Sequence, residues 1–131
     1  PTGAHPRGLY RLLRALASLG IFTEDDDHRF ALTPLGECLR SDVPGSVRSL
    51  AIMRGTWQYE TWGQLLYSVQ TNRPAFEEVF GQPLVDYLAQ HPERGRLFDD
   101  AMTGVHGRET AAMLEAYDFS GLGTLVDVGG G

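Results

Sequence analysis

A short apolar run leads directly into three glycines at the end of this chain, and it constrains the fold more than any other feature. Residues 124–128, Thr-Leu-Val-Asp-Val, have the length and composition of a strand buried in a parallel sheet. Gly129, Gly130 and Gly131 follow at once, and glycines there let the backbone approach a ligand at the carboxyl edge of the sheet. The pattern predicts a nucleotide-type crevice, with the carboxylate of Asp127 directed toward it.

This glycine-rich turn does not by itself identify a ligand. Folds that bind NAD, FAD or S-adenosylmethionine all use one, and a tight turn with no ligand is the simplest alternative. Such a glycine run normally continues into a helix, and the sequence stops before one. The opening residues, Pro1-Thr2-Gly3-Ala4, also lack the features of a domain start. We therefore expect the natural protein to continue in both directions.

The amino-terminal part predicts a helix, a β-hairpin and a second helix, in that order. Pro6 starts the first helix and Gly20 ends it, with leucines at helical spacing between them. Residues 21–23 and 29–32 are typical of short strands on either side of an acidic turn. Thr33-Pro34 supplies an N-cap and a first helical residue for the next helix. This order predicts a winged-helix unit whose first helices would precede the sequence.

The middle of the chain predicts a series of helices separated by turns. Asn72-Arg73-Pro74 and His91-Pro92 interrupt the helical pattern. The expected helices cover residues 46–53, 56–69, 75–80, 84–90 and 93–117. The second of these is expected to pack Trp62, Leu65 and Leu66 against its neighbours. The last carries an apolar stripe that we expect to face inward, formed by Phe98, Ala101, Met102, Val105, Ala112, Met113 and Ala116.

Composition argues against several classes of protein. The net charge of −6 disfavours a protein built mainly to grip nucleic acid, which usually needs a basic surface. The sequence has no apolar stretch long enough to cross a bilayer, and no signal-peptide pattern. The single cysteine, Cys38, cannot form an internal disulfide, so we expect a reducing, cytoplasmic compartment.

Several short runs, taken together and in order, carry a resemblance to a known family. The chain resembles the caffeate-type O-methyltransferases, a family of plant phenolic methyltransferases and of bacterial enzymes that tailor aromatic polyketides. The resemblance covers nearly the whole chain, and the joint order of its pieces carries it. These pieces are Arg11-Leu12-Leu13-Arg14, Leu32-Thr33-Pro34-Leu35-Gly36, Trp62-Gly63-Gln64-Leu65, Gly81-Gln82-Pro83, Phe98-Asp99-Asp100-Ala101-Met102, Tyr117-Asp118-Phe119 and Leu125-Val126-Asp127-Val128-Gly129-Gly130-Gly131.

The resemblance implies a mainly α-helical segment that leads into a Rossmann-like α/β methyltransferase domain. Residues 1–45 would be part of a winged-helix dimerisation module, and the protein would form a homodimer. Residues 46–117 would be a helical connector that supplies acceptor-pocket helices. Residues 118–131 would begin the cofactor-binding domain.

The resemblance also implies roles for individual residues. The cofactor S-adenosylmethionine would be bound by Asp127, Gly129, Gly130 and Gly131, with His106 beside it. The acceptor would be lined by Phe98, Met102, Val105 and Met53. At Val105-His106 the sequence departs from the plant pattern, which usually has His and then Ser. The catalytic histidine of the family would lie downstream, so no catalytic residue is expected here.

Two of these assignments have a structural alternative, and two aromatic residues are candidates on their own chemistry. Phe98 and Met102 lie on an apolar stripe, so a core role is the alternative to pocket contact. Trp57 and Tyr59 form an aromatic pair that would suit stacking on a flat substrate.

These patterns lead to one main functional hypothesis and two rivals. The hypothesis is methyl transfer from S-adenosylmethionine to a hydroxyl of an aromatic small molecule, in secondary-metabolite biosynthesis of the polyketide type. The first rival is a relative that keeps the cofactor but performs decarboxylation or hydroxylation. The second is a winged-helix DNA-binding regulator, because Arg7, Arg11 and Arg14 share the polar face of the first helix. The acidic turn nearby would repel the DNA backbone, so we expect no nucleic-acid partner. Because the sequence has no long apolar stretch, we expect no membrane either.

Overall fold

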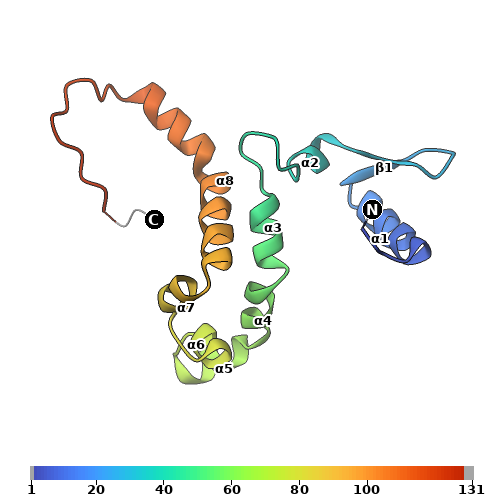
Figure 1. Ribbon diagram of the computed structural model, residues 1–131, viewed down its shortest axis with the longest axis horizontal. Helices are drawn as coiled ribbons and strands as arrows, with labels where there is room; N and C mark the ends of the chain where they lie inside the picture. The colour runs from blue at the N-terminus through green and yellow to red at the C-terminus, as the bar shows by residue number, and fades with distance from the viewer. Residues whose placement is uncertain (1, 129–131) are drawn as a thin grey trace.

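The protein's elements form two groups along the chain (Figure 1). The computed structural model describes residues 2–128, the side chain of residue 108 excepted. The expectation of a mainly helical chain is confirmed. The elements are α1 (Pro6–Ser18), β1 (Phe22–Glu24), β2 (Phe30–Leu32), α2 (Pro34–Glu37), α3 (Arg48–Arg54), α4 (Trp57–Gly63), α5 (Leu65–Thr71), α6 (Ala75–Phe80), α7 (Leu84–Gln90) and α8 (Pro92–Ala116).

The first group consists of α1, the β1–β2 hairpin and α2, as the sequence predicted. The strands pair antiparallel, with Phe22 opposite Leu32 and Glu24 opposite Phe30. The carboxylate of Asp25 accepts hydrogen bonds from the backbone N–H groups of Asp27 and Arg29, both at 2.9 Å. This side-chain turn closes the acidic loop and fixes the direction of the returning strand.

Helix α2 packs onto the hairpin through a cap and a glycine. The Thr33 hydroxyl accepts the backbone N–H of Gly36 at 3.1 Å and caps the helix. Gly36 is buried, and its α-carbon lies so close to the carbonyl of Ile21 that a Cβ would collide with it. A residue without a side chain is therefore required at this contact.

The second group, α3 to α8, contains the core of the described residues. Helices α3 and α8 lie side by side, and the short helices α4 to α7 close one end of the pair (Figure 1). Aromatic rings meet edge to face, with the Trp57 and Phe76 centroids 5.8 Å apart and those of Phe76 and Tyr87 5.4 Å apart. The buried cluster comprises Met53, Trp57, Phe76, Tyr87 and Ala101.

The helix expected over residues 56–69 is wrong, because the chain forms two helices there. Helix α4 ends at Gly63 and α5 begins at Leu65, with Gln64 between them at φ −102° and ψ 22°. Glycine weakens a helix interior because it loses the most backbone entropy on folding. Trp62, expected to pack, lies just before this break and is 66% exposed. Leu65 and Leu66 are exposed as well.

The strand expected over residues 124–128 is also wrong in this structure. The segment has no regular secondary structure, and Leu125, Val126 and Val128 are exposed. A buried parallel strand needs neighbours that pair with its backbone. Within residues 2–128 the only sheet is the β1–β2 hairpin, which lies in the other group of elements. Among these residues no other strand lies beside the apolar run to pair with it.

The inward stripe expected on α8 holds for the first half of the helix. Ala101 is fully buried, and Phe98 and Met102 pack against the core cluster. Farther along, Ala112, Met113 and Ala116 are exposed, because the helix extends beyond the end of α3 (Figure 1). No helix of the described part of the chain is long and apolar enough to cross a membrane.

Candidate functional site

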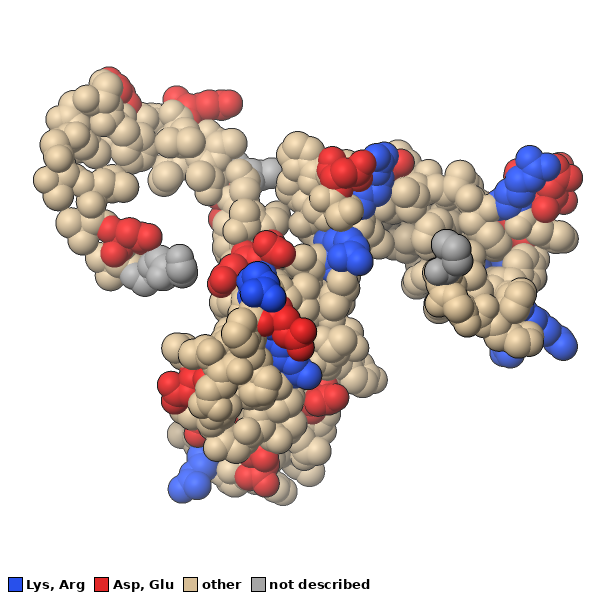
Figure 2. Space-filling model, viewed as in Figure 1, with Lys and Arg blue, Asp and Glu red and all other residues tan. Residues whose placement is uncertain are grey.

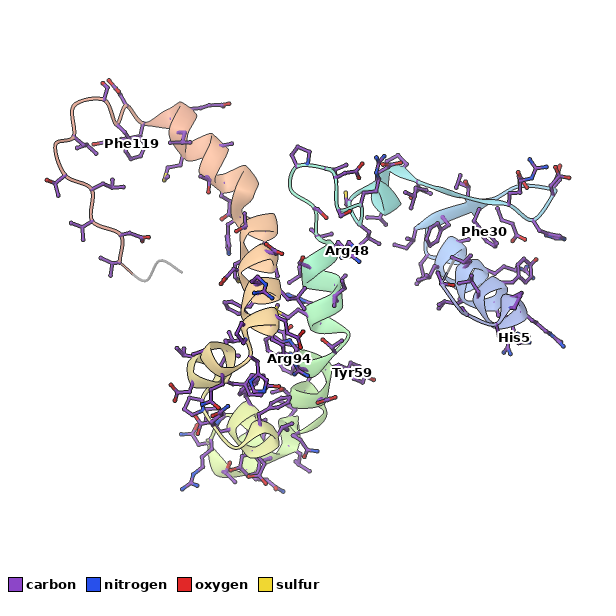
Figure 3. All side chains as sticks on the ribbon, in the orientation of Figure 1. His5, Phe30, Arg48, Tyr59, Arg94 and Phe119 are labelled. Carbon is purple, nitrogen blue, oxygen red and sulfur yellow. The ribbon has the colours of Figure 1, made fainter. Side chains whose placement is uncertain are left out.

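The structure brings four of the predicted acceptor residues into one region. Met53 on α3 and Trp57 on α4 are buried, with exposed fractions of 1% and 3%. Phe98 and Met102 on α8 pack against the same cluster from one side. Met53 and Trp57 therefore belong to the core of the described residues, while Phe98 and Met102, for which a core role was the alternative, are half-exposed at its edge. Tyr59, expected beside Trp57, points away from this region (Figure 3).

Two predicted residues on α8 lie outside this cluster. Val105 is 38% exposed and is not part of the buried cluster or of the residues packed against it. The His106 side chain is exposed, and its Nδ1 lies 2.8 Å from Oε2 of Glu109. This pair is local to the helix surface, with the two residues one turn apart. Nothing in these contacts assigns His106 a role.

The predicted cofactor residues lie on or beyond the C-terminal segment. Asp127 is exposed, in the extended stretch that leads away from α8 (Figure 1). Gly129, Gly130 and Gly131 lie outside the described residues. The carboxylate of Asp127 is accessible, which is compatible with meeting a cationic cofactor.

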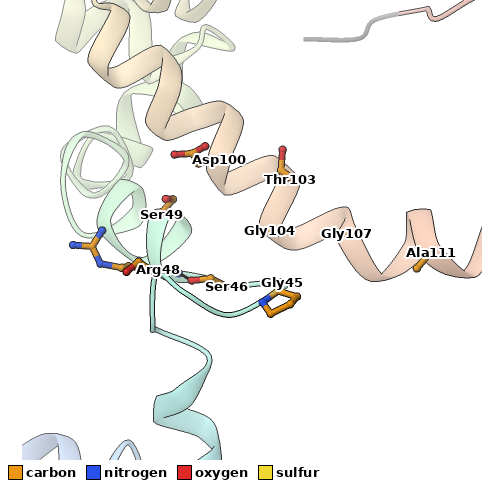
Figure 4. Close-up of a pocket in the computed structure, with 11 residues that line it drawn as sticks. Gly45, Ser46, Arg48, Ser49, Asp100, Thr103, Gly104, Gly107 and Ala111 are labelled. Carbon is orange, nitrogen blue, oxygen red and sulfur yellow. Dashed lines mark hydrogen bonds between the residues drawn. The ribbon is translucent and has the colours of Figure 1, made fainter.

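A hollow lies between α3, the loop before it and α8, and it is lined by none of the predicted residues (Figure 4). Its volume is about 720 Å³. On α8 it is lined by Asp100 and Gly104, whereas Phe98 faces elsewhere because two residues turn a helix through about 200°. The other lining residues are Ser41, Pro44, Gly45, Ser46, Arg48, Ser49, Thr103, Gly107 and Ala111.

A second pocket includes one predicted residue and one that the sequence reasoning missed. It has a volume of about 320 Å³ and lies where α3 and α4 meet the start of α8. Trp57 lines it together with Arg94, whose side chain lies among the helices of the second group (Figure 3). The remaining lining residues are Ile52, Thr56, Glu93 and Leu97.

Arg94 could have been found from its spacing. It precedes Phe98 by four residues and Met102 by eight, so the three side chains share one face of α8. An arginine on the same helix face as apolar residues predicted to line a pocket is a candidate for ligand contact. The apolar pattern by itself does not include this cation at the start of the stripe.

Some charged side chains of the remaining surface form local ion pairs. On the face in Figure 2, basic and acidic side chains lie next to each other. Arg29 contacts Asp27 at 2.8 Å and Arg40 contacts Asp42 at 2.6 Å. At α1, Arg14 lies 3.4 Å from Glu24, which also accepts a 2.8 Å hydrogen bond from the Tyr10 hydroxyl. The hydrogen bond from Tyr10 is the main reason that the pKa of Glu24 is lowered. A hydrogen bond between Glu24 and His28 is the second reason.

The chain matches two family descriptions over most of its length. Residues 1–42 match the O-methyltransferase dimerisation domain, and residues 62–131 match the O-methyltransferase domain. It is 45% identical over 130 residues to the phenazine O-methyltransferase PhzM of Lysobacter antibioticus, which covers 99% of this chain and 38% of that protein. It is 42% identical over 131 residues to 3-amino-4-hydroxybenzoate 4-O-methyltransferase of Streptomyces cremeus, covering 99% of this chain and 35% of that protein.

Solved structures agree with the sequence matches. The crystal structure of LaPhzM superposes with a TM-score of 0.85 at 46% identity, over 91% of this chain and 36% of that one. The O-methyltransferase NcsB1, in complex with S-adenosylmethionine and 2-hydroxy-5-methyl naphthoic acid, gives 0.73 at 31% identity, over 92% and 38% of the two chains.

These matches define a helical segment typical of methyltransferases, with a dimerisation unit followed by helices of the catalytic part. The chain belongs to the O-methyltransferase family. It spans little more than a third of the length of the two relatives named above, 38% and 35% respectively.

Proposed function

We propose that this chain is part of an S-adenosylmethionine-dependent O-methyltransferase that acts on a hydroxyl of an aromatic small molecule in secondary-metabolite biosynthesis. The observation that carries the proposal is the match of both family domains, in order, to a fold whose α3, α4 and α8 gather apolar side chains at one place. The relatives named above act on phenazine and hydroxybenzoate compounds, as their names state. An aromatic acceptor suits an apolar lining with an aromatic ring.

The domain assignment follows the two groups of elements. Residues 1–45 would form the winged-helix-like dimerisation module of a homodimer, residues 46–117 the helical connector, and residues 118–131 the start of a Rossmann-like cofactor domain. Leu12 on α1 and Leu19 directly after it are exposed, and they supply apolar surface for a second subunit. Cys38 is a free thiol, which favours the cytoplasm.

The site assignment divides the predicted residues between two ligands. Met53, Trp57, Phe98, Met102 and Val105 would line the acceptor side. Asp127, the three following glycines and His106 would bind the cofactor, which supplies a methyl group on a cationic sulfonium centre. The exposed carboxylate of Asp127 fits such a cation by charge.

The residues of this chain would mainly hold and orient the acceptor for methyl transfer. An acceptor oxygen reacts efficiently when it is held close to the methyl carbon and in line with it, and when its proton is removed. The helices that carry Phe98 and Met102 are anchored by the core, so they can hold a flat ring in one orientation.

Calorimetry with S-adenosylmethionine, followed by a methyl-transfer assay on a panel of hydroxylated aromatic acids, tests the proposal on the full-length enzyme. We expect micromolar binding of the cofactor and methylation of at least one hydroxyl. Asp127→Ala should weaken cofactor binding about tenfold or more, since a charged hydrogen bond is removed. Asp118→Ala, in the same C-terminal segment, is the control. A full-length protein with no affinity for the cofactor would contradict the proposal.

A further inference from the structure

Arg94 lines a pocket at the start of α8 together with one of the residues predicted to contact the acceptor. It lies in the first turn of α8, four residues before Phe98 on the same face, and it lines the pocket of about 320 Å³ with Trp57. Its Cζ lies 5.4 Å from the centre of the Tyr87 ring, which holds the guanidinium against the buried cluster. The side chain is half-buried and belongs to the pocket wall.

The charge of Arg94 is not compensated within the described part of the chain. None of the ion pairs found there involves Arg94. Glu93 also lines the pocket, but it is exposed, so water and salt screen its charge. Half-buried guanidinium groups usually meet a carboxylate or phosphate, because an unpaired charge away from water is costly.

Two hydrogen-bond donors of this pocket's residues lack acceptors. Among the described residues, Nη1 of Arg94 and Nε1 of Trp57 are buried and without a hydrogen-bond partner. Both groups can only donate hydrogen bonds, so a ligand that pairs with them must carry acceptor oxygens or nitrogens. Most buried donors in folded proteins are satisfied, and two orphans around one pocket indicate a missing acceptor group.

A carboxylate meets these requirements better than a neutral carbonyl. It offers two acceptor oxygens in a plane, which match the fork of a guanidinium, and it neutralises the charge. The beginning of the 25-residue helix α8 adds positive potential at the same end of the pocket. A neutral amide would satisfy one donor and leave the charge in place.

We propose that Arg94, together with Trp57, forms an anion-binding subsite of the acceptor pocket that selects aromatic acceptors carrying a carboxylate. The inference rests on the proposed function, in which a hydroxyl of the same acceptor is methylated. Arg94 would hold the acid at the α8 start, while Phe98 and Met102 contact the ring next to it on the same helix face. Arg94 is therefore a specificity-determining residue and takes no part in the transfer step.

Matched acceptors test this subsite in the full-length enzyme. The probes are 3-amino-4-hydroxybenzoate and 1,4-dihydroxy-2-naphthoate, each compared with its primary amide, which keeps the hydroxyl but removes the charge. In the wild type, KM for the acids should be lower than for the amides. Arg94→Gln should raise KM for the acids about 30-fold or more, with little change in kcat and little change in KM for the amides.

Two further variants separate charge from structure. Arg94→Lys keeps the charge but loses the planar fork, so its KM for the acids should fall between those of the wild type and the glutamine variant. Arg96→Gln removes an exposed arginine from the same helix turn and should leave both substrates unchanged. Thermal unfolding of Arg94→Gln near that of the wild type shows that the fold is retained.

The results separate this inference from the proposed function. Equal KM values for acid and amide in the wild type, or an equal loss for both in Arg94→Gln, would overturn the subsite while methyl transfer stands. If no acceptor is methylated, the proposed function fails, and equilibrium binding of the same acid and amide pairs still measures the subsite. Tighter binding of the acids that is lost in Arg94→Gln supports it; equal binding refutes it.

Discussion

The backbone carbonyl of Ser46 lies against the α-carbon of Gly104, in the space that a Cβ at residue 104 would occupy. This contact brings the loop before α3 onto the middle of α8, beside the hollow of about 720 Å³. It explains why a glycine stands within a helix, where it costs conformational entropy. The close approach of α3 to α8 depends on it.

Gly104→Ala should therefore destabilise the protein, although alanine is the better helix former. Relief of the collision requires the α3–α8 pair to separate, with an expected net loss of about 1–3 kcal/mol in the free energy of unfolding. Gly107→Ala is the matched control, since nothing lies within 4 Å of its added Cβ. That change should be neutral or stabilising by up to about 1 kcal/mol. Urea denaturation compares the two, and equal effects would contradict the contact.

Thr33→Ala should loosen α2 from the hairpin. The hydroxyl of Thr33 caps α2 through Gly36 and also donates to the carbonyl of Gly20 at 2.6 Å. Loss of a threonine cap costs about 1 kcal/mol, and up to about 2 in some proteins. Thr33→Ser keeps the oxygen and should restore most of the stability. Thermal unfolding followed by circular dichroism distinguishes them, and a serine variant as unstable as the alanine one would argue against the cap.

The Tyr10–Glu24 bond predicts a pH dependence of stability at low pH. Tyr10 and then His28 lower the pKa of Glu24 from its ordinary value of 4.5. A carboxyl whose pKa is lower in the folded state stabilises the protein above its unfolded pKa and loses this contribution as the pH falls through the folded value.

Tyr10→Phe removes the larger cause of this shift. The pKa of Glu24 should then rise toward 4.5, and the free energy of unfolding should change less with pH below that value. NMR titration of the Glu24 carboxyl measures the pKa, and urea denaturation at several acidic pH values measures the slope. Tyr59→Phe, an exposed tyrosine, is the control. An unchanged titration of Glu24 in Tyr10→Phe would show that the bond has no effect.

Met53 should behave as a core residue in any stability measurement. It is 1% exposed and lies in the buried cluster with Trp57. Met53→Ala is expected to cost about 2–5 kcal/mol, because it removes buried methylene groups and leaves a cavity. Met113→Ala, at a residue that is 52% exposed, should change stability by less than about 0.5 kcal/mol. Comparable losses at the two positions would show that Met53 is not anchored in the core.

Local patterns predicted most elements, because their end signals are residues with their own backbone preferences. The expected helices over 75–80 and 84–90 agree with α6 and α7 to the residue, since prolines precede both and a glycine ends the first. The break at Gln64 was missed because a single glycine before it is a weak signal that tertiary packing decides.

The candidate site was predictable only where it followed a helical stripe. Spacing placed Phe98 and Met102 on one face of α8, and the structure agrees. Arg94 lies on the same face, but whether a cation has a partner depends on which side chains the other helices bring near it. The burial of Trp57 likewise depends on Phe76, which is nineteen residues away in the sequence. Such contacts across the sequence have no local pattern.

The buried cluster draws its side chains from the second group of elements alone. We therefore expect helix α1, the hairpin and α2 to open as a separate unit, since they are held by a few hydrogen bonds and half-buried leucines. In hydrogen exchange its amides should open at lower free energy than those of α8. Any ligand or subunit that binds only the ordered form of this unit would slow that exchange in proportion to its concentration.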